Sequence, residues 1–270
     1  MNPVRLPPGV RDYLPVAAAR RRGIVSSLSA ELERWGYRTI ITPIYEYDEV
    51  LARGLGDHGR AMRLVEPSTG EVLALRPDLT AQVARLVATR LHDEPGPLRL
   101  AYQGSVVRLL GASGGQGELF QVGVELIDAP QPGGDLEIVM LAEAGLRAAG
   151  VGEVTLDLGH ADVPRAALDG LPLDAADAAA LEGALLRKDA ARVAEVARGL
   201  AVPARRKELL CALPTLYGGP EVLVRARKLV GGVAPEARRA LDELETLIER
   251  LGSCLPDGHA RLSIDLGEVR

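Results

Sequence analysis

A stretch near the middle of the chain, ELFQVGVELI (residues 118–127), alternates apolar and polar side chains as a β-strand does. Gln121, Gly123 and Glu125 fall on one face of this strand, because neighbouring side chains point to opposite sides. Gly123 is expected to leave open floor between two polar side chains that lie roughly 13 Å apart. We expect a small polar ligand to lie over this floor.

Charged residues elsewhere add to this candidate site. Arg108 lies on the expected partner strand, before the glycine-rich stretch 111–118, and its guanidinium suits a carboxylate or a phosphate. Asp78 and Glu125 can hold an ammonium or an imidazole. Together these groups suit a zwitterionic amino acid. The alternative, that the polar face is only solvated as in many antiparallel sheets, stays open on the residues alone.

Other kinds of catalytic site find little support. The sequence has no GxSxG, P-loop lysine or HExxH motif, and its four histidines have no ligand spacing, so we expect neither a metal nor a cofactor. Asp157 and Asp265 lie on polar faces of two expected strands. Paired carboxylates can do acid–base work, but we favour solvent exposure or a hydrogen bond to a neighbouring strand.

Periodicity predicts the elements that position these residues. An apolar stripe with helical spacing predicts a helix over residues 16–35, ended by Gly36. The strand expected over residues 37–46 is interrupted by Pro43, which places it at a sheet edge or bends it.

Three further elements follow along the chain. Residues 72–91 read as a strand, a turn and a helix whose start Asp78 or Thr80 can cap. Residues 99–110 and 118–128 predict a β-hairpin, and residues 134–150 predict another helix.

The second half of the chain contains two short segments of similar sequence. The segments VTLDLGH (154–160) and LSIDLGE (262–268) both alternate and both carry Asp-Leu-Gly, which predicts neighbouring strands of one sheet. The stretch between them has helical spacing. The expected organisation is a core over residues 1–160, a helical insertion over 161–255 and a return strand of the core over 256–270.

Composition limits the class of protein. The 270 residues are 47% hydrophobic and 26% charged, as in a globular protein of one or two domains. No apolar run approaches the roughly 20 residues of a membrane span, and no secretory signal is apparent, so we expect a cytoplasmic protein. Cys211 and Cys254 lack CxxC spacing and fit a reducing compartment. The net charge of −5 argues against nucleic acid as a partner.

Five segments resemble, in order, the class II histidyl-tRNA synthetase core: LPPGVRDYLP, WGYRTIITPIYEYDEVL, LALRPDLTAQVARLVATR, YQGSVVRLL…GELFQVGVELI and IDLGEVR. The resemblance implies an α+β fold with a mainly antiparallel class II synthetase-like sheet flanked by helices, and a helical insertion. It places Pro43 at the proline of the first class motif, which implies a homodimer through that motif.

The resemblance also assigns the candidate site. Arg108 stands at the arginine of the second class motif, and RPDLT matches the histidine-binding loop, with Asp78 and Thr80 against the substrate amine. Gln121 and Glu125 match residues that line the histidine pocket. These residues agree with the amino-acid site inferred from the strand pattern.

Two relatives share this core: the synthetase and its non-catalytic paralogue, the regulatory subunit of ATP phosphoribosyltransferase. Leu110 stands where the synthetase has a glutamate that holds adenine, and the loop 111–118 has no cation to neutralise a polyphosphate. GELFQVGVELI, TLDLGH, LLRKDAARV, LPTLYGGPEVL and IDLGEVR are similar to the regulatory paralogue, which keeps a glutamate at Glu118. That family usually retains arginines near Gly115 and Gly117, which this loop lacks. We therefore interpret the chain as a regulatory subunit with no catalytic residues.

The resemblance implies a partner and an effector. The partner is the short catalytic subunit of ATP phosphoribosyltransferase, which acts first in histidine biosynthesis, and the effector is histidine. Histidine binding in the pocket above and at a subunit interface are both compatible with the sequence. Both families continue after Arg270 with a Gly-x-Asp-Tyr-Tyr segment and a third class motif, so we expect a shortened chain. The alternatives are a divergent histidyl-tRNA synthetase and a stand-alone amino-acid- or tRNA-binding paralogue.

Overall fold

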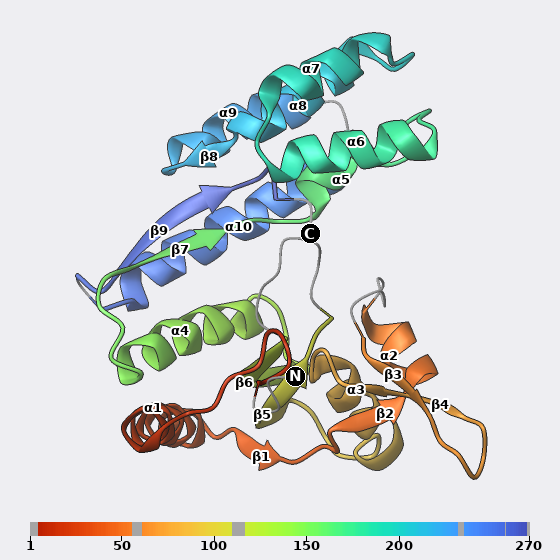
Figure 1. Ribbon diagram of the computed structural model, residues 1–270. Coiled ribbons are helices and arrows are strands. Elements are labelled where there is room, and N and C mark those ends of the chain that lie inside the picture. The colour runs from red at the N-terminus through yellow and green to blue at the C-terminus, as the bar shows by residue number, and fades with distance from the viewer. Residues whose placement is uncertain (1–4, 56–60, 110–116, 232–234, 257, 269–270) are drawn as a thin grey trace. The chain divides into compact units, whose positions relative to one another are not determined.

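The computed structural model of the chain describes residues 5–55, 61–109, 117–231, 235–256 and 258–268 (Figure 1). Contacts divide it into an N-terminal unit, Met1–Gly150, and a C-terminal unit, Val151–Arg270. Among the described residues, no helix is both long and apolar enough to cross a membrane.

The described residues of the N-terminal unit form two three-stranded sheets and four helices. In chain order its elements are α1 (Pro15–Arg34), β1 (Arg38–Ile40), β2 (Tyr45–Tyr47), α2 (Asp48–Leu55), β3 (Arg63–Val65), β4 (Val72–Leu75), α3 (Thr80–Arg90), β5 (Leu98–Val107), β6 (Glu118–Ile127) and α4 (Gly133–Ala148). One sheet has the order β1-β5-β6, with β1 parallel to β5 and β5 antiparallel to β6. The other has the order β2-β4-β3 and is antiparallel throughout.

These elements confirm the predictions for this part of the chain. Helix α1 covers the predicted range, and Gly36 after it has a φ of 82°, a conformation that glycine adopts without strain. Pro43 lies between β1 and β2, each of which is the edge strand of its sheet. Strands β5 and β6 form the predicted hairpin, and α3 and α4 follow where periodicity placed helices.

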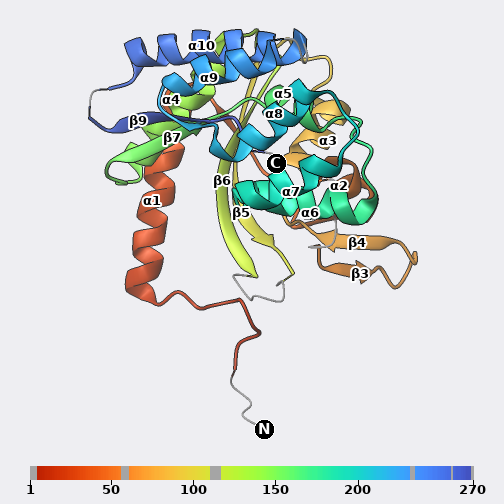
Figure 2. The ribbon, with the colours of Figure 1, turned by 90° about the horizontal axis from the view of Figure 1, so that it is seen from above.

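Helices cover both faces of the β5–β6 hairpin. On one face, Leu79 and Val83 at the start of α3 pack against Leu98, Leu100 and Val106 of β5. The opposite face packs against α1 and α4 through a cluster of Leu32, Tyr37, Ala101 and Leu141. Figure 2 shows α1 and α3 on opposite sides of the hairpin. The hairpin is therefore the central layer of this unit.

A hydrogen-bonded ion pair joins α4 to β5 on the α1 side of the hairpin. Arg99 donates from Nε and Nη2 to the two carboxylate oxygens of Glu137, each at 2.7 Å, and Tyr37 donates its hydroxyl to Glu137 at 2.9 Å. The hydrogen bonds from Arg99 are the main reason that the pKa of Glu137 lies below its ordinary value, although burial opposes them.

Glu137→Gln is expected to lower the free energy of unfolding by about 1–2 kcal/mol at pH 7, a value discounted because Arg99 is one-third exposed. A carboxyl whose folded pKa is depressed stabilises the fold above its unfolded pKa, near 4.3, and this contribution is lost as the pH falls through the lower folded value. Urea unfolding at pH 7 and pH 3 tests this, with the exposed Glu33→Gln as control. An equal loss of stability at both pH values would contradict the prediction.

The C-terminal unit is mostly helical. Its elements are β7 (Val154–Leu158), α5 (Asp162–Leu168), α6 (Ala175–Leu186), α7 (Ala190–Gly199), α8 (Ala204–Ala212), the 3₁₀ turn η2 (Leu213–Thr215), β8 (Tyr217–Gly218), α9 (Glu221–Val230), α10 (Pro235–Cys254) and β9 (Ala260–Asp265). Strand β9 lies between β7, to which it is parallel, and β8, to which it is antiparallel.

The two segments of similar sequence are neighbours in one sheet, as the sequence predicts, because β7 and β9 pair over five residues. The division of the chain nevertheless differs from the expected one. Contacts group both strands with helices α5 to α10, so the boundary falls after Gly150 and the expected core residues 151–160 and 256–270 belong to the C-terminal unit.

Candidate functional site

The predicted ligand residues lie on the face of the β5–β6 hairpin that packs against α3. Asp78 lies in the turn between β4 and α3, Thr80 is the first residue of α3, and Gln121 and Glu125 lie on β6. Arg108 follows the last residue of β5 and so lies just beyond the strand on which it was expected. We call these five residues, together with Tyr102, the Asp78 cluster.

Asp78 is the centre of this cluster. Its Oδ1 accepts the backbone N–H of Thr80 at 2.7 Å, although Leu79, and neither Asp78 nor Thr80, is the N-cap of α3, and its Oδ2 accepts Nε2 of Gln121 at 3.1 Å. Burial alone would raise the pKa of Asp78, but the hydrogen bonds from Thr80 and Gln121 and the charge of Arg108 lower it below its ordinary value. The cluster therefore holds an ionised carboxylate at neutral pH.

Arg108 is held by the same turn. Its Nε donates to the carbonyl of Pro77 at 2.8 Å, and its Nη2 lies 3.9 Å from Oδ2 of Asp78. Because its side chain is 38% exposed, part of the guanidinium faces solvent and is available to an anionic group.

The prediction of open space above Gly123 is wrong. Tyr102 stands opposite Gly123 in the strand register, and a Cβ built on Gly123 would lie only 2.6 Å from the Tyr102 hydroxyl oxygen. The tyrosine ring thus covers the glycine and fills the space that the strand pattern left vacant. Periodicity on one strand does not reveal this, since the covering side chain comes from the neighbouring strand.

Tyr102 is a further candidate residue of this site, which the pattern of β6 alone does not reveal. Its ring is buried, and its hydroxyl lies 3.4 Å from Oε1 of Glu125. Burial is the main cause that raises the pKa of Tyr102 to about 12. The phenol is therefore protonated at neutral pH and can donate to Glu125, which orients this carboxylate.

Gln121 has unused hydrogen-bonding capacity. Its Oε1 is buried and has no hydrogen-bond partner among the described residues. Buried polar atoms are normally paired, so an unpaired acceptor at this position suits the donor of a ligand. The surrounding face is not uniformly solvated, because apolar residues of β5 and β6 on both sides of the polar strip pack against α3.

Arg76 forms the far end of the same face. It is 6% exposed, and its Nη2 would lie 2.1 Å from a Cβ built on Gly104, the residue that pairs with Gln121. Its guanidinium donates to backbone carbonyls on two sides, at Ser105 and at Thr42 and Pro43. We regard Arg76 as a residue that positions the strands.

Leu110 and most of the glycine-rich loop, residues 110–116, lie outside the described residues, as does Arg270. Glu118 begins β6, and its Oε1 accepts the hydroxyl of Ser105 at 2.9 Å.

The two strand carboxylates of the C-terminal unit have different surroundings. Asp265 accepts Nζ of Lys188 at 2.7 Å and the backbone N–H of Gly267 at 2.9 Å, whereas Asp157 is exposed. Asp157 and Asp265 line one hollow of about 370 Å³ with His160. No group of three His, Cys, Asp or Glu side chains suited to a metal ion occurs in the described parts of the chain.

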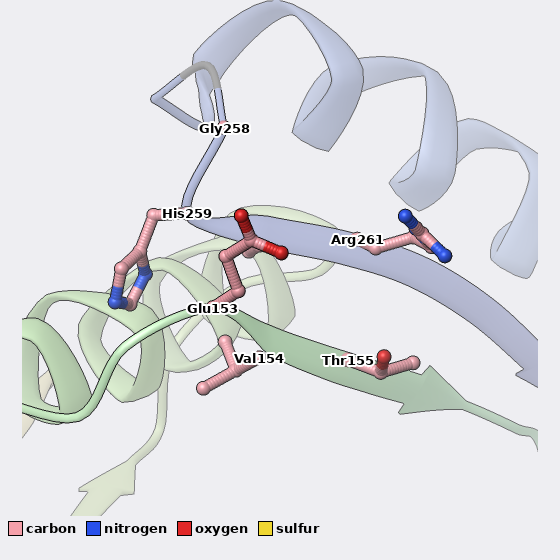
Figure 3. A pocket seen from close by; sticks show the side chains of 7 residues that line it. Glu153, Val154, Thr155, Gly258, His259 and Arg261 are labelled. Carbon is pink, nitrogen blue, oxygen red and sulfur yellow. The ribbon is translucent and has the colours of Figure 1, made fainter.

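A second hollow in the C-terminal unit, of about 440 Å³, lies where β7 and β9 begin (Figure 3). It is lined by Glu153 and Thr155 from the β7 side and by His259 and Arg261 from the β9 side. Nε2 of His259 lies 3.1 Å from the carbonyl oxygen of Val151, so this ring is held at the edge of the unit.

The arrangement of the Asp78 cluster suits binding rather than covalent chemistry. Asp78, Gln121 and Glu125 offer acceptors for an ammonium or an imidazole N–H, and Arg108 offers a cation for a carboxylate. The cluster residues include no serine or cysteine nucleophile paired with a base. A zwitterionic amino acid therefore matches its charges.

Comparison with known proteins gives consistent matches. The histidyl-tRNA synthetase family model matches residues 9–270. Two curated relatives are named ATP phosphoribosyltransferase regulatory subunit: that of Syntrophotalea carbinolica is 39% identical over 98% of this chain and 62% of its own length, and that of Geobacter metallireducens is 38% identical over 98% and 61%. The chain thus spans less than two thirds of the length of these relatives.

A solved structure agrees with these matches. The crystal structure of an ATP phosphoribosyltransferase regulatory subunit/histidyl-tRNA synthetase from Bacillus halodurans has a TM-score of 0.85 and 33% identity, over 98% of this chain and 68% of that chain. This likeness confirms the predicted α+β, class II synthetase-like fold.

Proposed function

We infer that this chain, which belongs to the histidyl-tRNA synthetase family and, within it, to the ATP phosphoribosyltransferase regulatory subunits, acts as a regulatory subunit without catalysis of its own. Its partner in this proposal is a short catalytic subunit that joins ATP to phosphoribosyl pyrophosphate. The chain activates this partner and makes it sensitive to histidine. The observation that carries the proposal is 39% identity to a regulatory subunit over 98% of the chain.

The Asp78 cluster is the proposed histidine site. The ammonium of histidine would meet the Asp78 carboxylate and the unpaired Oε1 of Gln121, and the carboxylate would meet Arg108. Glu125, oriented by Tyr102, would accept an imidazole N–H. For histidine to inhibit through this site, it must bind two states of the complex with different affinity.

A homodimer through the first class motif is part of the same proposal. Ile41 is 88% exposed and Ile44 is 45% exposed, on either side of the segment that contains Pro43. Apolar side chains this exposed favour contact with another chain.

The test is the rate of the cognate short catalytic subunit, alone and with this chain, each with and without histidine. A rate that rises with this chain and falls when histidine is added would support the proposal. If neither the rate nor the histidine response changes, the same assay with a longer chain of the same family would separate a missing interface from a wrong assignment.

Glu125→Gln is expected to weaken histidine binding by about tenfold, because a charge-assisted hydrogen bond becomes a neutral one. The fold should be unaffected, since Glu125 is half-buried and packs little. Isothermal titration calorimetry measures the affinity, and Glu118→Gln, on the opposite face of the same strand, is the matched control. Unchanged affinity in Glu125→Gln would place the effector site elsewhere, for example at a subunit interface.

An active histidyl-tRNA synthetase is the second candidate, because the family model carries that description. Histidine-dependent exchange of pyrophosphate into ATP tests it. Clear exchange that is abolished by Arg108→Ala would replace the regulatory proposal with a catalytic one.

A further inference from the structure

A groove lies on the α1 side of the β5–β6 hairpin, on the face opposite to the Asp78 cluster. Its volume is about 740 Å³, within the roughly 300–1,000 Å³ of small-molecule sites. Among the residues that line it are Tyr13, Ala18, Arg21, Arg22, Gln103 and Phe120. The segment before α1 runs along the hairpin end, where the Gly9 carbonyl accepts the backbone N–H of Gly117 (Figure 2).

Arg21 is the most constrained charged group in this groove. Its guanidinium carbon lies 4.2 Å from the ring centroid of Phe120 and 4.7 Å from that of Tyr13. Such cation–π contacts are favourable and restrict the position of the guanidinium, whose N–H groups lie in its plane. The Arg21 guanidinium is therefore held in a position where its N–H groups can bind an anion.

In the part of the chain that the structure describes, no ion pair neutralises the arginines of the groove. Neither Arg21 nor Arg22 makes an ion pair with any described residue, and the residues that line the groove include no Asp or Glu. The hydroxyls of Ser26 and Ser29 add further polar groups. Apolar atoms of the lining form a surface against which the carbon skeleton of a ligand can pack. Two unpaired guanidinium groups match the charge of a phosphate monoester, about −1.5 to −2 at pH 7.

We propose that this groove binds a small phosphate ester, with the phosphate on Arg21 and Arg22 and the carbon part against the apolar wall. A sugar phosphate and a nucleoside monophosphate share this chemistry. The groove lies within the N-terminal unit, so the proposal does not depend on histidine binding or on regulation of a catalytic subunit.

The test is isothermal titration calorimetry of the full chain at low ionic strength with ribose 5-phosphate, AMP and inorganic phosphate. At least one of the two esters should bind more tightly than inorganic phosphate. The ester with the higher affinity shows whether the groove prefers a sugar phosphate or a nucleoside monophosphate. Arg21→Gln should weaken ester binding by at least about tenfold. Arg20→Gln removes the same charge from the neighbouring exposed position outside the groove lining, and should change the affinity less than about twofold.

Three outcomes would overturn the proposal. Equal losses in Arg20→Gln and Arg21→Gln would mean that only the general charge of α1 attracts the anion. Absence of binding by either ester at millimolar concentration would show that the groove is no phosphate site. A change in sedimentation on Arg21→Gln, with no ester binding, would assign the groove to contact with a second copy. Phe120→Leu, which keeps both charges, should weaken ester binding without changing the melting temperature by more than a few degrees.

Discussion

Arg76→Met is expected to lower the free energy of unfolding of the N-terminal unit by about 3 kcal/mol. The guanidinium donates from Nε to the Ser105 carbonyl at 2.8 Å, and from Nη1 to the Thr42 carbonyl at 2.9 Å and the Pro43 carbonyl at 3.1 Å. Methionine has no donor, so the buried Thr42 carbonyl and the half-buried Ser105 carbonyl would lose this partner, whereas the Pro43 carbonyl would keep Nε2 of Gln82 at 2.9 Å. Burial lowers the pKa of Arg76, because desolvation disfavours its charged form. Replacing the cation removes this desolvation cost, which offsets part of the lost stability.

Tryptophan fluorescence reports on unfolding of the N-terminal unit, because Trp35 is the single tryptophan of the chain and packs in the core of that unit. Urea unfolding followed by Trp35 fluorescence should show the loss for Arg76→Met and almost none for Arg90→Met, at the exposed end of α3. Arg76→Lys keeps the charge but not the fork, so an intermediate loss is expected. If Arg76→Met and Arg90→Met unfold alike, the carbonyls around Arg76 must find other donors.

Arg76 also joins two parts of the chain that matter for the proposed function. The carbonyls of Thr42 and Pro43 belong to the segment of the first class motif, and Ser105 belongs to the strand beside the Asp78 cluster. A small movement of the first segment would reach β5 through these hydrogen bonds. The contact offers a physical route between the proposed dimer interface and the proposed histidine site.

Local sequence patterns were sufficient to predict most elements of the fold. Spacing of apolar residues placed α1, α3 and α4, and the interruption at Pro43 separated β1 from β2 as expected. These features depend on residues close together in the chain. The unit boundary was not predictable in this way, because it depends on how β7 and β9 pack with helices α5 to α10.

The candidate site shows the same limit at the level of single residues. The strand pattern identified Gln121 and Glu125 as neighbours on one face, and the register confirms this. It could not show that Tyr102 covers Gly123 or that Arg76 covers Gly104, because each contact joins residues at least 20 positions apart. Space beside a glycine is defined by the neighbouring strand or turn, and the glycine's own strand does not reveal it.

Gly267→Ala is expected to lower the free energy of unfolding of the C-terminal unit by about 3 kcal/mol, the upper end for overpacking. A Cβ on Gly267 would lie 2.2 Å from the carbonyl oxygen of Leu213, which is backbone and cannot rotate away. Leu213 is fully buried in the helical core, and the next turn is fixed because Leu266 donates its N–H to the Leu216 carbonyl at 2.9 Å.

The same argument explains the repeated Asp-Leu-Gly. In the first copy, a Cβ on Gly159 would lie 2.4 Å from the carbonyl oxygen of Asp265, so each glycine lets another backbone approach the end of its strand. Gly252→Ala, in α10 with open space around it, is the matched control and should stabilise the protein by up to about 1 kcal/mol. Hydrogen exchange of residues 213–216 and 260–267 reports on the right region, with faster exchange expected only in Gly267→Ala. If exchange there stays slow, the close approach is relieved at little cost, and the two glycines mark a shared turn rather than a packing requirement.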